Sequence, residues 1–220
     1  METLYIDKDI IVCEKEYGVA SQAGHSPNML EIIKREHGVS AFVVHRLDIK
    51  TSGLMVYALN DSSASSLSSQ ISNGLFEKEY LAIVHGQTPT SVDMCDLLYH
   101  DKTTNKSFVV DTRRKGAKEA RLSLITLSTI THEGKVLSLV KIRLYTGRTH
   151  QIRVQLSSRN FPLYGDGKYG ARDNDKIALY SHTLAFSHPK TGKKMSFGAL
   201  PCVDGAWALF ADVLNGIMPI

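Results

Sequence analysis

A polar segment at residues 45–53 carries the densest set of reactive side chains in the sequence. It reads His-Arg-Leu-Asp-Ile-Lys-Thr-Ser-Gly, which brings together an imidazole, a guanidinium, a carboxylate and two hydroxyls. Apolar runs of strand length flank it at residues 41–44 and 54–59, and a loop held between two buried strands presents its side chains from a fixed frame. Asp48 is the candidate catalytic residue, although a single loop aspartate is more often a turn former or a helix cap.

A second candidate segment, residues 143–153, joins a basic strand end to a helix start through a glycine. The first turn of such a helix offers backbone N–H groups to an anion. Thr149 and Arg153 are four residues apart and share one helix face, so we expect Arg153 to project into a cleft. The alternative is a surface arginine in a weak salt bridge. Residues 162–170 match no phosphate-loop pattern, and we expect a structured turn that borders the site.

Several other kinds of site find no support in the sequence. The nine histidines include no i, i+4 pair with a helper carboxylate, so no metal site is predicted. The three cysteines are far apart and favour neither a disulfide framework nor a zinc knuckle. No serine nucleophile elbow, Walker loop or dinucleotide fingerprint occurs. A glycosidase would need a second carboxylate near Asp48, and only a residue distant in sequence is left to supply it.

The charge is unevenly distributed along the chain. Residues 135–194 contain twelve Lys and Arg against three acidic residues, a local net charge of +9 within a chain whose total is +4. A one-sided basic stretch is what a phosphate backbone requires, because each neutralised phosphate releases counterions. A solvated lysine-rich surface is the alternative.

The sequence also contains no sign of a membrane segment. No window approaches the roughly 18 uninterrupted apolar residues of a membrane span, and the first residues are acidic where a signal peptide is basic. We therefore expect a cytoplasmic protein without a membrane partner.

The elements that position these segments are mostly short strands. We predict an opening hairpin at residues 4–6 and 10–13, a strand at 76–84, an antiparallel pair at 120–130 and 136–145, and a return from 178–186 to 195–197. Residues 87–118 look polar and turn-rich. Because strands and helices do not alternate strictly, the predicted fold is α+β, with a mixed, largely antiparallel sheet flanked by helices.

Four helices complete this prediction. The first is expected to start at Ser26-Pro27 and to stop at Gly38, and the second to span residues 61–72 with Asp61 as its cap. A third covers residues 149–158, and a helical stripe closes the chain with Val203, Trp207, Ala211 and Leu214. We expect residues 1–220 to form a single domain.

The segment His45-Arg46-Leu47-Asp48, followed by Thr-Ser-Gly, resembles the catalytic signature of the RluA-type pseudouridine synthases. Further motifs follow in the order typical of the family, and together they extend from residue 4 to about residue 200: residues 4–12, Lys-Glu-Tyr-Leu-Ala at 78–82, Gly-Arg-Thr-His-Gln-Ile-Arg at 147–153, Gly-Asp at 165–166, Tyr-Gly at 169–170, and His-Pro at 188–189. Such an ordered set is highly specific.

The resemblance implies a pseudouridine synthase fold with a central RNA-binding cleft, and the isomerisation of uridine to pseudouridine within RNA. Asp48 would be the nucleophile, by attack on the ribose C1′, by addition to C6 of the uracil, or by a glycal route. Tyr80 would stack on the base and act as general base at the sugar. Arg153 would pair with Asp48 and keep its carboxylate ionised. No redox, metal or energy cofactor is implied.

The resemblance also implies how RNA is bound. Arg46 would intrude into the RNA where the target uridine is flipped out. The remaining residues assigned to orienting the loop or contacting RNA are His45, Thr51, Arg148, His150, Gln151 and Lys168.

The chain departs from the family pattern at one place. Family members usually carry a Lys-Pro pair after the opening strand, and here the pair is Lys15-Glu16. No separate N-terminal RNA-binding domain is expected, so recognition of a structured stem-loop of ribosomal or transfer RNA would fall to the catalytic domain, acting as a monomer. The competing hypothesis is a catalytically silent RNA-binding or RNA-folding protein on the same scaffold.

Overall fold

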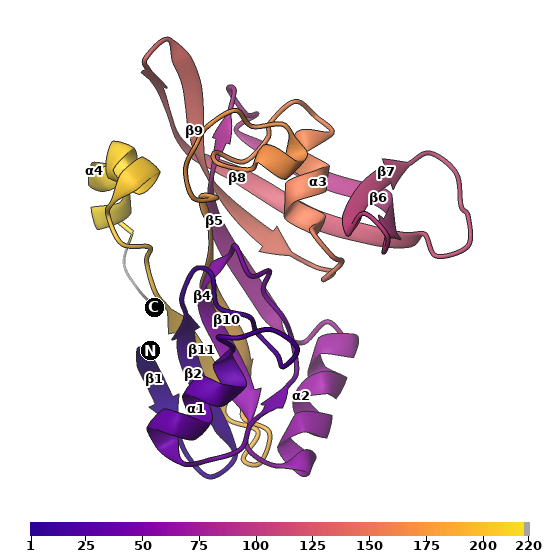
Figure 1. Cartoon of the computed structure of the whole chain (residues 1–220), viewed down its shortest axis with the longest axis vertical. Helices are drawn as coiled ribbons and strands as arrows, with labels where there is room; N and C mark the ends of the chain where they lie inside the picture. The colour runs from indigo at the N-terminus through magenta and orange to yellow at the C-terminus, as the bar shows by residue number, and fades with distance from the viewer. Residues whose placement is uncertain (218–220) are drawn as a thin grey trace. The chain divides into compact units, whose positions relative to one another are not determined.

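The computed structural model describes residues 1–217, which form two compact units (Figure 1). Unit 1 consists of residues 1–78 and 180–201, and unit 2 of residues 79–179 and 202–217. Both units combine β-strands with a few helices, which confirms the predicted α+β class. Within residues 1–217, no helix has both the length and the apolar character needed to cross a membrane.

Unit 1 is built on a mixed sheet in the order β1-β2-β4-β10. Its neighbours are antiparallel except for β4 and β10, which run parallel, and two short strands extend it, β3 beside β4 and β11 beside β10. The strands are β1 (Thr3–Ile6), β2 (Ile10–Lys15), β3 (Phe42–Val43), β4 (Ser52–Ala58), β10 (Leu179–Ser187) and β11 (Lys194–Gly198). The predicted opening hairpin and the return at residues 178–197 are confirmed.

Two helices of unit 1 begin at asparagines that accept hydrogen bonds from the first helical turn. Asn28 caps α1 (Met29–His37), and Asn60 caps α2 (Asp61–Ser72). The prediction of Ser26-Pro27 as the start of α1 and of Asp61 as the cap of α2 was therefore wrong by one to two residues. In both cases the asparagine directly before the helix accepts from the N–H groups that the first turn leaves unpaired, two residues after Ser26 in α1 and one residue before Asp61 in α2.

Gly53 allows β4 and β10 to approach closely. Its φ of +109° lies in a region that side chains rarely adopt, and a Cβ at this position would lie 2.4 Å from the backbone oxygen of Ser181. Ser181 also donates from Oγ to the backbone oxygen of Leu54 at 3.0 Å. The start of β4, directly after the Asp48 loop, is therefore fixed against β10.

Unit 2 contains an antiparallel sheet in the order β5-β9-β8-β6-β7. Its strands are β5 (Glu77–His85), β6 (Ser91–Asp101), β7 (Lys106–Val110), β8 (Lys118–His132) and β9 (Lys135–Leu144). The polar, turn-rich reading of residues 87–118 was wrong, because these residues supply β6 and β7. On β6 polar Asp93 and Cys95 alternate with buried Met94, which is the period of two of a half-buried strand.

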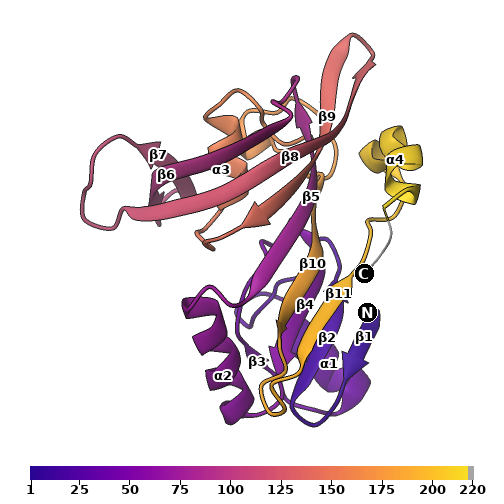
Figure 2. The same cartoon turned by 180° about the vertical axis from the view of Figure 1, so that it is seen from behind.

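A short helix, α3 (Gln151–Ser157), covers one face of the unit 2 sheet (Figures 1 and 2). Leu98 and Ala120 from the sheet pack there against Val154 of α3 and against Tyr169 of the 3-10 helix η1 (Gly167–Tyr169). The C-terminal stripe forms a 3-10 helix, η2 (Gly205–Phe210), and a short α4 (Ala211–Asn215). Of that stripe Leu214 is buried, whereas Val203 lies before η2 and is exposed.

Candidate active site

The Asp48 loop of unit 1 is held from two sides. Ser21 donates from Oγ to the backbone oxygen of Leu47 at 2.7 Å and accepts from the Leu47 N–H at 3.0 Å. On the other side of Asp48, the N–H of buried Thr51 donates to the Asp48 backbone oxygen at 3.0 Å. The loop therefore presents Asp48, whose side chain is half-buried, from a backbone with little freedom.

Lys15 lies directly beneath this loop and is fully buried. Its Nζ donates to the backbone oxygens of Glu16 at 2.9 Å, Val19 at 2.8 Å and Ile49 at 3.4 Å. Burial lowers the pKa of Lys15 to about 8, and the negative charge of Asp48 opposes this shift. The ammonium thus ties β2 to the residue that follows Asp48 and puts a positive charge on the protein side of that carboxylate.

His45 has a buried side chain that binds the backbone of unit 1. Its side chain is buried, and its Nε2 accepts the backbone N–H of Val56 on β4 at 3.1 Å. The ring packs against the ring of Phe76, with centroids 5.5 Å apart. Burial, and to a lesser extent the charge of Lys78, lowers the pKa of His45 to about 3, so the imidazole stays neutral. Of the two predicted roles for His45, this geometry supports orienting the loop.

Arg46 is the exposed member of the motif. Its neighbours His45 and Leu47 are buried, whereas Arg46 is exposed. An alternation of buried and exposed side chains anchors the loop on one side and leaves the guanidinium free to meet a ligand on the other.

Tyr80 and Arg153 both belong to unit 2. Tyr80 is a buried residue of β5 and pairs with Ile142 of β9, which pairs in turn with Leu124 of β8. Paired residues share a face of a sheet, so Tyr80 lies on the same face as Leu124. Ala120 is four residues before Leu124 on β8 and therefore shares this face, which α3 covers. The hydroxyphenyl group and the helix that carries Arg153 are therefore on the same side of this sheet.

Arg153 makes a two-pronged ion pair with Asp166. Its Nε is 2.7 Å from Oδ2 and its Nη2 is 2.8 Å from Oδ1 of that carboxylate. Both side chains are buried, and the guanidinium carbon lies 5.1 Å from the centre of the Tyr169 ring. A parallel fork of this kind fixes the plane of the guanidinium as well as its position. The alternative prediction for Arg153, a surface salt bridge, was wrong because its side chain is 6% exposed.

Asp166 was not among the predicted site residues. Residues 162–170 were expected to be a turn, and the turn is confirmed by hydrogen bonds from the N–H groups of Tyr169 and Ala171 to the Asp166 backbone oxygen. A Cβ on Gly165 would lie 2.2 Å from the backbone oxygen of Lys176. The only signal in the sequence was an aspartate next to a glycine. The function of Asp166 depends on its ion pair with Arg153, which lies thirteen residues away in the chain.

Gln151 caps the start of α3 from within. Its Oε1 accepts from the Arg148 N–H at 3.0 Å and from Thr146 Oγ1 at 2.8 Å, and its Nε2 donates to the Arg121 backbone oxygen at 3.1 Å. The Gln151 side chain is buried. Through these bonds Gln151 stabilises the start of α3. Arg148, whose Nε donates to the Glu119 backbone oxygen, is only half-buried.

His150 and Lys168 attach this region to the β6–β7 hairpin. His150 has a left-handed backbone, and its Nδ1 is 3.0 Å from the Tyr169 hydroxyl. That hydroxyl accepts the N–H of Ser107 on β7 at 2.8 Å. The exposed Lys168 donates from Nζ to the backbone oxygens of Thr104 and Asn105 at the hairpin tip. Both residues therefore help to position the hairpin.

One group in unit 1 has metal-ligating side chains close together. Ligand atoms of Asp7, Asp9 and His188 lie within 4.8 Å of one another. The N–H groups of residues 190 and 191 donate to Nδ1 of His188, so its Nε2 carries a proton and donates to Asp7 Oδ2 at 2.8 Å. The other oxygen of Asp7 accepts from the N–H groups of Asp9 and Ile10. These bonds occupy the lone pairs of Asp7 and His188 that a metal ion would need. The geometry therefore favours a structural role, in which the two side chains hold their turns together.

Comparison with known proteins supports the motif-based interpretation. Residues 9–158 match the family model described as RNA pseudouridylate synthase. The chain is 34% identical over 214 residues to "Uncharacterized RNA pseudouridine synthase YlyB" of Bacillus subtilis, covering 90% of this chain and 68% of that protein. It is 32% identical over 209 residues to "Ribosomal large subunit pseudouridine synthase C" of Buchnera aphidicola subsp. Schizaphis graminum, covering 87% of this chain and 64% of that protein. The chain thus spans about two thirds of the length of these relatives.

Solved structures share the fold. "Human RNA Pseudouridylate Synthase Domain Containing 1" matches with a TM-score of 0.79 and 21% identity, over 100% of this chain and 96% of that chain. "Human RNA Pseudouridylate Synthase Domain Containing 4" matches with a TM-score of 0.75 and 22% identity, over 97% and 93% of the two chains. Since the family model spans more than half of the chain and relatives above 30% identity cover most of it, the chain belongs to the RNA pseudouridylate synthases, a family of isomerases that act on RNA, and its resemblance to the RluA type is confirmed.

Proposed function

We propose that the chain isomerises a specific uridine of a structured RNA to pseudouridine, with Asp48 as the nucleophile. The observation that carries this proposal is the Asp48 loop, which is clamped by Ser21 and Thr51 and has the buried Lys15 ammonium beneath it. A carboxylate on a clamped loop with a positive charge beneath it meets the positional and electrostatic requirements of nucleophilic catalysis.

The reaction rearranges the substrate without adding or removing atoms overall. The bond between N1 of the uracil and C1′ of the ribose breaks, the base turns, and a bond forms between C5 and C1′ while the hydrogen on C5 leaves and N1 takes up a proton. Asp48 attacks C1′, adds to C6, or assists a glycal route. Tyr80 stacks on the base and accepts a proton at the sugar, and Arg153, aimed by Asp166, pairs with the Asp48 carboxylate.

The enzyme must extract the base from the RNA before it acts. We assign this step to Arg46, whose exposed guanidinium can fill the stack that the flipped uridine leaves. Unstacking costs a few kcal/mol, and phosphate contacts by the basic stretch at residues 135–194 offset this cost. Arg148 and Lys168 belong to that stretch.

The proposed RNA partner is a structured stem-loop. One relative is named for the large ribosomal subunit, which supports a ribosomal stem-loop, and transfer RNA is the second candidate. The central RNA-binding cleft, the action of residues 1–220 as one catalytic domain, the monomeric state and the cytoplasmic location stay predictions.

The competing hypothesis is an RNA-binding or RNA-folding protein that performs no chemistry. The presence of Asp48, Tyr80 and Arg153 in matching contexts argues against it. Salt-dependent RNA binding without pseudouridine formation would argue for it.

Release of tritium from RNA labelled at C5 of uridine tests the proposal, because C5 loses its hydrogen only when the new bond forms. We expect release by the wild type and none by Asp48→Asn, which keeps the shape of the side chain but removes its nucleophilicity. RNA affinity should be nearly unchanged in this variant. Near-normal turnover by Asp48→Asn would exclude Asp48 as the nucleophile, and tight RNA binding by a wild type that releases no tritium would favour the competing hypothesis.

A further inference from the structure

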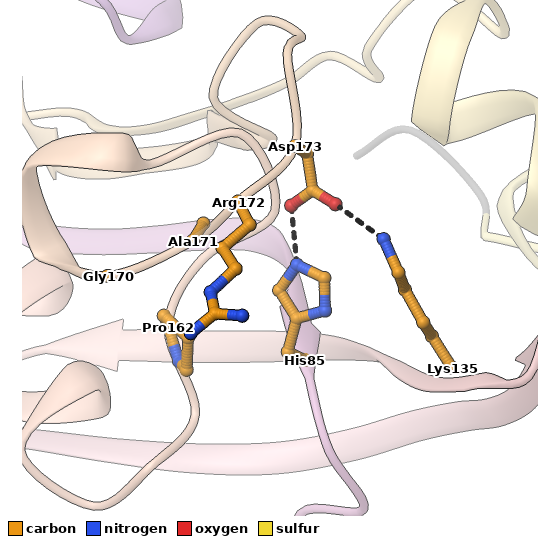
Figure 3. A pocket seen from close by; sticks show the side chains of 7 residues that line it. All are labelled: His85, Lys135, Pro162, Gly170, Ala171, Arg172 and Asp173. Atoms are coloured by element: carbon orange, nitrogen blue, oxygen red, sulfur yellow. Dashed lines mark hydrogen bonds and ion pairs between the residues drawn. The ribbon is translucent and has the colours of Figure 1, made fainter.

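Unit 2 contains a pocket that the proposed reaction does not use. It is lined by the end of β5, the start of β9, Pro162 and the segment 170–173, and it has a volume of about 210 Å³. Figure 3 shows the side chains that line it. They include His85, Lys135, Arg172 and Asp173, none of which belongs to the catalytic motifs.

Asp173 organises the base of this pocket. One carboxylate oxygen lies 2.5 Å from His85 Nε2 and accepts the Gly165 N–H at 3.2 Å, and the other lies 3.4 Å from Lys135 Nζ. Burial by itself disfavours the charge of Asp173, but the hydrogen bonds from His85 and Gly165 outweigh it and hold the pKa below its usual value. The carboxylate is therefore ionised and occupied by donors, with its side chain 4% exposed.

The basic side chains around Asp173 retain hydrogen-bond donors that the carboxylate does not engage. Lys135 is 57% exposed and makes a single long contact with the carboxylate, so its ammonium retains N–H groups for a ligand. The exposed Arg172 extends its guanidinium into the pocket, beside Pro162 and toward His85 (Figure 3). Three basic side chains thus surround one carboxylate that is already satisfied.

The imidazole of His85 is fixed in place. Its ring stacks on the ring of Tyr164, with centroids 5.6 Å apart and an angle of 16° between the planes. Because Nε2 faces the Asp173 carboxylate, Nε2 carries a proton and donates to that carboxylate. The stacked ring therefore holds Asp173 at the base of the pocket.

The volume limits the size of the ligand. A water molecule takes up about 30 Å³ in the liquid, so 210 Å³ holds a tetrahedral anion and a few waters. Pockets for whole small molecules start at about 300 Å³. A phosphate group fits these limits, and its oxygens match the fork of Arg172 and the ammonium of Lys135.

We propose that this pocket binds a phosphate group, which in the enzyme's complex with substrate is a phosphodiester of the RNA strand. The identity of the strand rests on the proposed function, whereas the phosphate site itself does not. Tyr80 and His85 lie on the same strand five residues apart, and because this spacing is odd their side chains project from opposite faces of the strand. The link to RNA comes instead from Lys135 and Arg172, which both belong to the basic stretch at residues 135–194 that the proposed function assigns to phosphate contacts.

Two linked measurements on the 220-residue chain test the site. The first is NMR of protein labelled at histidine, titrated with inorganic phosphate, with chloride as the salt control and His85→Gln to assign the resonance. We expect the His85 signal to shift and saturate. Arg172→Gln should raise the Kd for phosphate about tenfold, the effect of losing one charged hydrogen bond, whereas Arg35→Gln, an arginine of α1 with a side chain 70% exposed, should not.

The second measurement separates the sources of the phosphate. A synthetic uridine-containing stem-loop is titrated with wild type, Arg172→Gln and Arg35→Gln at several salt concentrations. Competition of the stem-loop with phosphate at His85, and a salt slope lower by about one in Arg172→Gln, would identify the RNA backbone as the ligand. A His85 response without competition would assign the pocket to free phosphate and overturn the RNA part.

A His85 signal that ignores phosphate would overturn the whole proposal, even if Arg172→Gln lowers the salt slope, because Arg172 would then meet RNA outside the pocket. Tritium release is measured independently for each variant. Its absence in wild type would refute the proposed reaction while leaving the phosphate titration interpretable.

Discussion

Arg153 and Asp166 form a buried fork in which two guanidinium nitrogens meet two carboxylate oxygens at 2.7 and 2.8 Å. Asp166→Asn keeps the shape of the side chain but removes its charge. We expect a loss of about 3 kcal/mol of unfolding free energy, because a buried charge is left without its partner. We also expect turnover to fall about a hundredfold, because the guanidinium is no longer held in place. Chemical denaturation and tritium release measure the two effects.

The pair formed by Arg159 and Asp96 is a matched control. It is also a two-pronged pair, formed end-on by Nη1 and Nη2 with distances of 2.9 and 3.0 Å, but the Arg159 side chain is 33% exposed. Asp96→Asn should therefore destabilise less and leave turnover close to wild type. Equal losses of turnover in Asp96→Asn and Asp166→Asn would mean that general destabilisation, and not the aiming of Arg153, explains the effect.

Gly53 and Gly24 separate the effect of backbone strain from the effect of a close contact. Their φ angles are +109° and +108°, but a Cβ on Gly53 would lie 2.4 Å from the Ser181 oxygen, whereas one on Gly24 would meet nothing within 4 Å. Gly24→Ala should cost about 1 kcal/mol of unfolding free energy from strain alone. Gly53→Ala should cost at least about 3 kcal/mol more, because β4 and β10 must move apart. Thermal denaturation of the two variants side by side would show no such gap if β4 and β10 were free to separate.

Lys15 predicts a rise of stability at alkaline pH. Its pKa is about 8 in the folded protein against 10.5 for an exposed lysine, so between these values the unfolded chain binds more protons and stability increases with pH. The gain over this interval is about 3 kcal/mol at about 1.4 kcal/mol per unit of pKa. Lys15→Met should lose this increase. Denaturation of both proteins from pH 8 to pH 10.5 checks it, with Lys34→Met as the control for one lost charge, and parallel curves for wild type and Lys15→Met would contradict it.

His45 predicts an effect of the same sign, in which stability also rises with pH, but in the acidic range. Its pKa is about 3 when folded against 6.5 when exposed, so the unfolded chain takes up the proton first and stability falls as pH drops below 6.5, by up to about 1.4 kcal/mol per pH unit. NMR should show a neutral ring from pH 8 to pH 5. His45→Leu should destabilise by about 1–3 kcal/mol, because it removes the acceptor of the Val56 N–H.

His45→Gln serves as the rescue variant, since its amide oxygen can accept the same hydrogen bond. Neither variant should alter the salt slope of RNA binding. A changed slope, or an imidazole that titrates near pH 6.5, would show that His45 meets the RNA.

Local sequence patterns predicted an element well where the spacing of its own apolar residues shows which face is buried. The opening hairpin and the β8–β9 pair follow from alternation of apolar residues and from turn residues between them. The Asp48 loop was recognised from its apolar flanks, but the buried strand predicted at residues 41–44 was wrong, because β3 covers only Phe42–Val43 and Phe42 is 39% exposed. The prediction for residues 87–118 failed because β6 and β7 are half-buried strands in which polar residues interrupt the apolar ones, although the two strands pair with each other as a hairpin.

The contacts that complete the site were not predictable from local patterns. Lys15 was noticed only as part of an altered motif, and its burial follows from carbonyl groups up to 34 residues away. Asp166 gains its role from Arg153, and the assignment of Gln151 to RNA overlooked a side chain that is buried among backbone groups. A residue type states what a side chain can do, but the tertiary partners decide which of these abilities is used.

The parallel pairing of β4 with β10 also has a consequence during synthesis of the chain. Leu54 and Ser181, which are hydrogen-bonded across it, are 127 residues apart, so a ribosome adding about 5–20 residues per second needs roughly 6–25 s to deliver the partner of β4. Throughout that interval the edge at the start of β4, which later pairs with β10 through Ser52 and Gly53, stays unpaired, whereas β3 already pairs with the end of β4 at Tyr57 and Ala58. In the nascent protein this open edge can pair with a strand of another chain, and a chaperone that covers it would prevent such aggregation.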